Sequence, residues 1–482
     1  MSEEVRRLDD ESRANISASQ PDRMLTGFPW ASAIILYTLS WGWSLLRPNT
    51  LYWDDWEIFF EKPLNNGIKY LEQTGRPPWS GLVEYLLLHI GTWAVTVIAF
   101  VLFLTSSFFL FGILRHREVF DLQVVRNIAL LFLIVPVNHS RVSLAIFDYT
   151  SSYFLFYLGW FLLVRYRSNI GFVVSCVVLF LSFKTHSFLF FVLLPFLHFA
   201  WLHRARLTNF RQPNQVHLQL VLLALLPVFY VIARQLFWPP IESWQDYQQP
   251  TSAGVVTGLW PVLAAFLFLG VIGYRHLKKL ETHSGVVMLI GGFAITALAL
   301  FPYFAGELYV GYAGRPAIVT VFEFRADWRS RHQLLMPLGL ALSVVGLNEL
   351  LRQRFKNLFF GFVLVLSVAL NMFWGSQYFL MSHKQEQLVE LFKTTKGELT
   401  IASVEDQTLR FNGRESTFRG YEWNGFMTLA GIPTDRPGCN ALPTGSVLTL
   451  KSDVSYLKAL ATRDLDLYFE VKPCSKVLVK DG

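Results

Sequence analysis

The sequence predicts a helical membrane protein with many transmembrane segments and a small domain after the last of them. Of its 482 residues, 53% are hydrophobic, 16% aromatic and only 16% charged, which is far from the usual composition of a soluble globular protein. Apolar stretches of roughly 17 to 25 residues, the length that crosses a bilayer as a helix, recur from residue 28 to residue 380. After residue 380, short β-like runs such as "SVLTL" alternate with Gly and Pro turns.

The apolar stretches divide the chain into three parts. We expect an N-terminal tail over residues 1–27, a transmembrane domain over 28–380, and a C-terminal α/β or β-rich domain over 381–482. The transmembrane part is expected to be all-α, with about eleven spans. These are residues 28–46, 89–114, 122–137, 149–164, 169–183, 187–202, 216–236, 255–274, 285–304, 333–350 and 357–380.

The loop charges predict the orientation of the chain. Every second short loop is basic, beginning with Arg115, Arg165, Arg204, Arg275 and Arg352, and basic loops stay on the cytoplasmic side. The remaining loops hold the acidic residues. The N-terminus is therefore predicted inside and the C-terminal domain outside, with the longest external loops at residues 47–80 and 305–332.

The basic residues do not indicate nucleic acid as a partner. The net charge is +7, but Lys and Arg lie in short loops between apolar runs and form no basic stripe. No phosphate-binding loop of the GxxxxGK[ST] type is present, so nothing in the sequence indicates a nucleotide-driven pump.

Two cysteines bear on the orientation of the tail. Cys439 and Cys474 both fall after residue 380, where an oxidising compartment would permit a disulfide between them. The alternative is two free thiols in a cytoplasmic tail.

The first external loop carries the main candidates for catalysis. In "LYWDDWEIFF", Asp54, Asp55 and Glu57 lie among aromatic residues that favour the membrane surface. A carboxylate held there is suited to act as a general base toward a hydroxyl. Asp54 and Asp55 are the preferred pair, with Glu57 as a supporting charge. The alternative is an acidic interfacial helix with no catalytic role.

The late external loop carries the main candidates for phosphate binding. Basic residues collect there on the side where the positive-inside rule disfavours them, and the Arg fork suits a lipid-linked phosphate. They are Arg315, Arg325, Arg329, Arg331 and His332. The alternative is ion pairs with Glu323 and Asp327, or with anionic lipid headgroups.

Two shorter loops add weaker candidates. Lys184 and His186 lie in a short turn between apolar walls, where a phosphate would be one partner for the charge and snorkelling of the Lys is the ordinary alternative. His139 and Arg141 lie in the second external loop and are candidates for contacts with a sugar or an acceptor.

The order of these features resembles the GT-C superfamily of integral-membrane glycosyltransferases, and among them the bacterial O-antigen glucosyltransferases. The resemblance lies in "YWDDW", the later "GRPPW" with Gly75, Arg76 and Pro77, the many spans with short cytoplasmic loops, and the external C-terminal part. It implies a catalytic base at Asp54 or Asp55. It also implies donor-phosphate binding by the later basic residues and a substrate contact at Arg76.

The resemblance further implies where the protein acts and what it meets. It implies a bacterial inner-membrane enzyme whose active site faces the periplasm, with a polyprenyl-phosphate sugar as donor and a glycan or glycolipid as acceptor. A small flippase and a cytoplasmic-side synthase of the donor would be partners, together with membrane lipids. Whether Mg²⁺ or Mn²⁺ joins the acidic pair stays open. The alternatives are an O-antigen ligase or polymerase and a flippase for a lipid-linked sugar.

Overall fold

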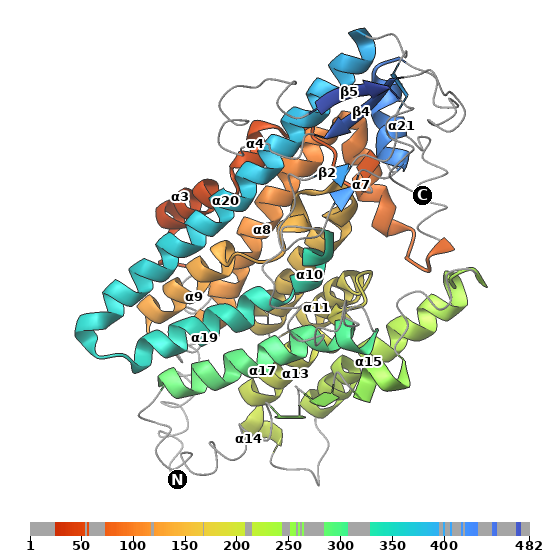
Figure 1. The fold of residues 1–482 in the computed structure, drawn as a ribbon. Helices are drawn as coiled ribbons and strands as arrows, with labels where there is room; N and C mark the ends of the chain where they lie inside the picture. The colour runs from red at the N-terminus through yellow and green to blue at the C-terminus, as the bar shows by residue number, and fades with distance from the viewer. Residues whose placement is uncertain are drawn as a thin grey trace, which may run out of the picture.

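The computed structural model is a bundle of helices with a few short strands near one end (Figure 1). The structure describes residues 25–53, 55–56, 73–116, 120–166, 168–207, 215–242, 251–256, 259–260, 263–264, 284–306 and 328–394, and in the tail 399–400, 405–406, 416–417, 420–431, 446–450 and 469–473. The expected N-terminal tail and the span at 255–274 lie almost wholly outside this part.

Helices account for most of the described residues before residue 395. They are α3 (Trp30–Trp41), α4 (Trp43–Leu46), α7 (Trp79–Ile90), α8 (Thr92–Arg115), α9 (Leu122–Ile134), α10 (Phe147–Arg165), α11 (Asn169–Ser182), α12 (Phe188–Phe191), α13 (Leu193–Leu202), α14 (Arg204–Leu207), α15 (Gln215–Phe237), α17 (Ser284–Ala305), α19 (Met336–Leu350) and α20 (Gln353–Thr394). Short 3-10 helices, η2 (His139–Val142), η3 (Leu144–Ile146) and η6 (Trp328–Gln333), lie in the connections.

Within the described part, four helices are long and apolar enough to cross a membrane. They are α8, α15, α17 and α20, while several other apolar helices, such as α3 and α9, have only 10 to 17 residues. Apolar side chains on the outer faces support a lipid environment, because Ile170, Leu218 and Val365 are 78%, 60% and 70% exposed. The structure thus supports a membrane protein, but helix length and composition together identify four spans among the described residues and not the expected eleven.

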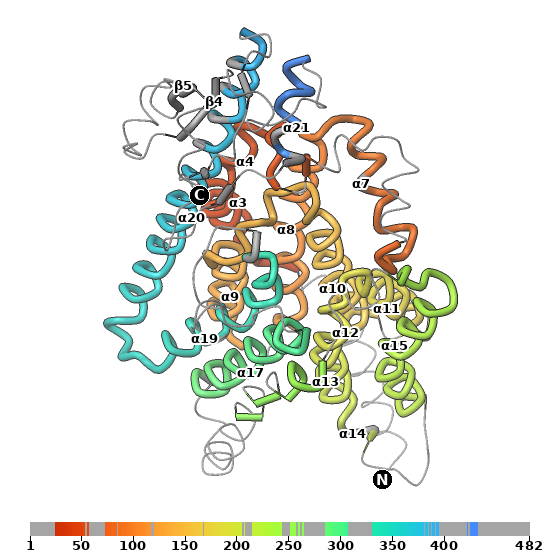
Figure 2. Tube along the Cα trace, turned by 45° about the vertical axis from the view of Figure 1, so that its right-hand side comes forward, coloured from red at the N-terminus to blue at the C-terminus, as the bar shows by residue number. Residues whose placement is uncertain are grey.

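The α17–α19 pair illustrates how the bundle packs. The two helices lie side by side in both views (Figures 1 and 2). Their backbones approach so closely that a Cβ on Gly339 would lie 2.6 Å from the backbone nitrogen of Thr296, and one on Gly292 would lie 2.5 Å from that of Ser343. Small residues allow such contact where lipid provides no hydrophobic driving force between helices.

The tail after residue 394 contains short strands and one helix. Strand β4 (Ser446–Leu450) pairs in parallel with β1 (Leu399–Thr400) and antiparallel with β5 (Phe469–Pro473), and β2 (Glu405–Asp406) pairs with β3 (Ser416–Thr417). Helix α21 (Gly420–Leu429) packs on α20. Because most residues between these elements lie outside the described part, the expected β-rich domain remains a prediction.

Candidate functional site

Asp55 holds the first loop in place from a fully buried position. Its backbone nitrogen donates to the carbonyl oxygen of Tyr52 at 3.0 Å, and the nitrogen of Tyr52 donates back to Asp55 Oδ2 at 2.8 Å. Asp55 Oδ1 accepts from the backbone nitrogen of Ala145 at 2.8 Å and from the Ser143 hydroxyl. The carboxyl group, 0% exposed, therefore joins the first loop to the segment before α10.

Burial raises the pKa of Asp55 from 3.8 to about 7. Removal from water disfavours the charged form. The hydrogen bonds from Ala145, Ser143 and Tyr52 favour it and act in the opposite direction. Asp55 is thus a carboxyl group that changes charge near neutral pH.

The same loop is hydrogen-bonded to the C-terminal part of α20. Gln385 Nε2 donates to the carbonyl oxygen of Leu51 at 2.8 Å, and the hydroxyls of Thr50 and Ser382 are 2.6 Å apart. These contacts join residues more than 330 positions apart in sequence. Two distant segments of the chain are therefore fixed to each other beside Asp55.

The helix α21 also packs on this loop. The rings of Trp56 and Phe426 meet edge to face with centroids 4.7 Å apart, and both side chains are buried. The tail consequently contacts the residue that follows Asp55.

A second group of charged residues surrounds Asp148. Lys184 Nζ lies 2.9 Å from Asp148 Oδ1 and 2.7 Å from the Ser151 hydroxyl, and Arg76 Nη1 lies 3.6 Å from Asp148 Oδ2. Asp148 and Lys184 are buried, whereas the side chain of Arg76 is 26% exposed. The Asp148 carboxylate therefore bridges a buried cation and one that solvent or a ligand can reach.

His186 lies beside this group and is uncharged at neutral pH. Burial, together with the nearby positive charges of Arg234 and Arg76, lowers its pKa to about 3. Arg234 Nε donates to the carbonyl oxygen of Gly75 at 2.9 Å, which fixes it next to Arg76. A neutral histidine in this position can donate or accept a hydrogen bond without adding charge.

The late loop reaches the same region through η6. The ring of His332 lies against Tyr303 with centroids 5.0 Å apart, and the Tyr303 hydroxyl lies 3.0 Å from the hydroxyl of Ser187. Arg331 lies close enough to Tyr303 to interact with it electrostatically. The guanidinium of Arg76 lies 5.7 Å from the ring of Tyr149, which also neighbours Tyr303.

Several predicted site residues are thus brought together. Arg76, Lys184, His186, Arg331 and His332 come from three loops and converge around Asp148 and Tyr303. We name Arg76, Asp148, Lys184, His186, Arg234 and Arg331 the Asp148 cluster.

His139 and Arg141, expected to contact a sugar or an acceptor, are instead enclosed in the bundle. His139 Nε2 lies 3.2 Å from Asn371 Oδ1, its ring packs against Trp41, and burial lowers its pKa to about 3. The Arg141 guanidinium lies 3.2 Å from the Trp41 ring centroid. Neither side chain presents the open surface that a glycan would need in this structure.

Other predicted residues lie outside the described part. They are Asp54, Glu57, Arg315, Arg325, the side chain of Arg329, and the expected disulfide partners Cys439 and Cys474. In the described ranges, no three His, Cys, Asp or Glu side chains are grouped closely enough to hold a metal ion. The metal at the acidic pair therefore stays untested.

Sequence reasoning did not select Arg234, Ser143 or Tyr303. Arg234 falls within the expected span at 216–236, and an ionisable residue inside an apolar span is by default a functional candidate. That signal would have identified it. Ser143 and Tyr303 carry no comparable signal, because their roles depend on contacts with distant segments.

Comparison with known proteins adds no relative. No family model matches the chain, and a search of curated proteins found no match either.

Proposed function

We propose that this protein is a GT-C-like membrane glycosyltransferase that moves a sugar from a polyprenyl-phosphate donor to a hydroxyl of a glycan or glycolipid. The observation that supports it is the proximity of the acidic first loop to the Asp148 cluster. Ser143 and Ala145 bind Asp55, and Asp148, three residues further along, binds Lys184 and contacts Arg76. A carboxylate loop and a cationic surface joined in this way suit transfer from a phosphate-bearing donor.

The cationic surface would bind the donor phosphate. Among the described residues, the cluster holds four cations, Arg76, Lys184, Arg234 and Arg331, and one carboxylate, Asp148, and His186 adds no charge. This excess favours a phosphate and would stabilise the charge that develops as the sugar leaves it. Arg76 would make the most direct contact because its side chain remains partly exposed. Lys184, bound to Asp148 and Ser151, would instead hold Asp148 in position.

The acidic pair would divide its tasks. A general base must reach the acceptor hydroxyl within about 3 Å. Asp55 is buried, and both of its oxygens accept hydrogen bonds from the protein. We therefore assign Asp55 to positioning the loop and Asp54 to the removal of the acceptor's proton. A single displacement of this kind would invert the anomeric carbon.

The finer topology belongs to the same proposal. We propose about eleven spans, an internal N-terminus, an external C-terminal domain closed by a Cys439–Cys474 disulfide, and an active site that faces the periplasm of a bacterial inner membrane. The shorter apolar helices, such as α9 with 13 residues, would then cross the membrane together with the loop residues that flank them. The loop charges support this orientation.

The test is transfer of a radiolabelled sugar from polyprenyl phosphate to a glycan acceptor by the purified protein in liposomes. We expect Asp54→Asn to abolish transfer, with a fall of about 10² to 10⁴. Asp55→Asn should lower kcat less, and Arg76→Gln should mainly raise KM for the donor. Arg352→Gln, a change at an exposed residue far along the chain, is the matched control and should leave transfer unchanged.

Two outcomes would overturn the proposal. Transfer that survives Asp54→Asn together with Asp55→Asn would remove the carboxylates from the chemistry. Movement of the labelled donor across the bilayer without formation of a glycosidic bond would identify a flippase.

A further inference from the structure

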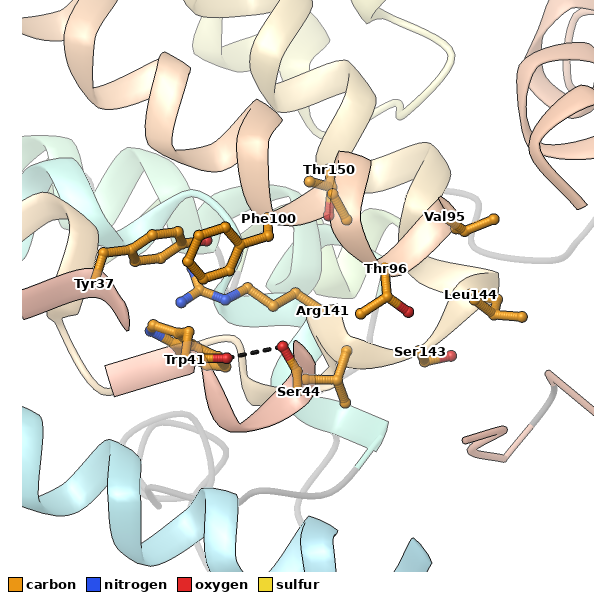
Figure 3. Close-up of a pocket in the computed structure, with 12 residues that line it drawn as sticks. Tyr37, Trp41, Ser44, Val95, Thr96, Phe100, Arg141, Ser143, Leu144 and Thr150 are labelled. Carbon is orange, nitrogen blue, oxygen red and sulfur yellow. Dashed lines mark hydrogen bonds between the residues drawn. The ribbon is translucent and has the colours of Figure 1, made fainter. Parts of the chain in front are cut away.

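A small pocket lies beside the first loop, apart from the Asp148 cluster. Figure 3 shows its walls, which come from α3, α4, α8, the start of α10 and the segment that contains Arg141. Its polar lining consists of Ser44, Thr96, Arg141, Ser143 and Thr150, and its apolar lining includes Tyr37 and Trp41. The pocket thus has both ring faces and hydrogen-bonding groups.

Arg141 is the charged residue of this pocket. Its side chain extends between the rings of Tyr37 and Phe100 on one side and Trp41 on the other (Figure 3). The guanidinium carbon lies 3.2 Å from the Trp41 ring centroid and 4.1 Å from that of Phe103. The residue is 8% exposed, and its only described hydrogen bonds involve the backbone.

The guanidinium has no counter-charge among the described residues. No described carboxylate pairs with Arg141, and Nη2 is enclosed without a hydrogen-bond acceptor. The hydroxyl of Thr150, which lines the same pocket, also has no described partner and is enclosed. Ring faces compensate part of the charge of a buried cation, but they offer no acceptor in the plane of its N–H groups. Arg141, with its uncompensated charge, and Thr150, with a donor that has no described acceptor, therefore both line one small pocket.

We propose that this pocket binds a small monovalent inorganic anion, such as chloride, between Arg141 and Thr150. A halide supplies the missing negative charge and accepts hydrogen bonds from several directions. The cavity volume is about 30 Å³, close to the share of liquid volume that one water molecule takes, so a carboxylate or phosphate ester would need more room. The proposal is independent of the proposed glycosyl transfer, since it needs neither donor nor acceptor.

The bound anion would also stiffen the first loop. Ser143, two residues after Arg141, lines the pocket and donates to Asp55. An anion that fixes Arg141 would therefore limit the movement of the segment to which Asp55 is bonded.

Thermal unfolding of the purified protein in detergent tests the proposal. Sodium chloride is compared with sodium gluconate at equal ionic strength. We expect chloride, and likewise bromide, to raise the midpoint by about 2–4 °C, with a rise that continues with the logarithm of the anion concentration, as linkage requires for a ligand that binds only the folded state. Arg141→Met should abolish the response. The control Arg352→Met should retain it.

A milder variant keeps the test valid if Arg141→Met does not fold. Thr150→Val preserves shape but removes one donor, so the same rise in midpoint should require about fivefold more chloride. Equal midpoints in chloride and gluconate for the unmodified protein, or an unchanged chloride response in Thr150→Val and in a folded Arg141→Met, would overturn the proposal.

Discussion

The substitution Asp55→Asn should change how stability depends on pH. The pKa of Asp55 is raised from 3.8 to about 7 in the folded protein, so the folded state binds its proton more tightly than the unfolded state does. This group therefore contributes stability that is fully present below pH 3.8 and is lost as pH rises through about 7.

The magnitude follows from the same two pKa values. Their difference corresponds to about 4 kcal/mol, of which about 3 kcal/mol falls between pH 5 and pH 8. An amide resembles the protonated carboxyl group, but it places an NH₂ opposite a backbone N–H of Ala145 or Tyr52. The lost hydrogen bond should cost about 1–3 kcal/mol at every pH. The variant should be less stable at pH 5, and the difference should close or reverse by pH 8.

The assay is the unfolding midpoint of both proteins in detergent from pH 5 to pH 8. The quantity to compare is the difference between variant and unmodified protein, because the titration of all other groups cancels in it. Ser143→Ala is a useful companion, since it removes one donor to Asp55 and leaves the carboxyl group able to titrate. A difference that stays constant with pH would refute the assignment of a raised pKa to Asp55.

Two further predictions concern the Asp148 cluster. Lys184→Met leaves the buried Asp148 carboxylate with Arg76 at 3.6 Å and should lower the free energy of unfolding by about 3–5 kcal/mol. Adding Asp148→Asn to Lys184→Met should restore part of this lost free energy. Chemical unfolding of the variants measures it, and losses that simply add would contradict the pairing of Lys184 with Asp148. Gly75→Ala should destabilise by about 1–3 kcal/mol, because Gly75 has φ +73° and a Cβ there would lie 2.6 Å from Arg234 Nη2. Gly361→Ala, with no atom within 4 Å of the new Cβ, is the control, and equal midpoints for the two variants would contradict the strain.

The sequence predicted where most helices lie but not their lengths. Apolar runs identify segments that avoid water, and the described helices fall on nearly all of them. Their ends depend on local turns that hydropathy does not register. Ile134, for example, ends α9 three residues before the expected end at 137, and Asn138 then has φ +57°.

The types of residue in the candidate site could be predicted from the sequence, but the contacts between them could not. The unusual acids and cations between the apolar segments were visible as exceptions to membrane composition. Which of them face each other depends on contacts across the chain. Asp148 is the centre of the cluster because of its contacts with Arg76 and Lys184, which are distant in sequence, whereas Arg141 is a buried cation that spacing alone could not separate from a surface residue.

The long helix α20 has a mechanical consequence. Its 42 residues make it about 63 Å long, roughly twice the thickness of the hydrocarbon layer. Through Ser382 and Gln385 it is fastened to the first loop, and further along the chain it carries the tail helix α21. An unbroken helix transmits tilt and rotation along its length. The first loop, α20 and α21 would therefore move together. Movement of the tail helix α21 would also move the first loop that holds Asp55.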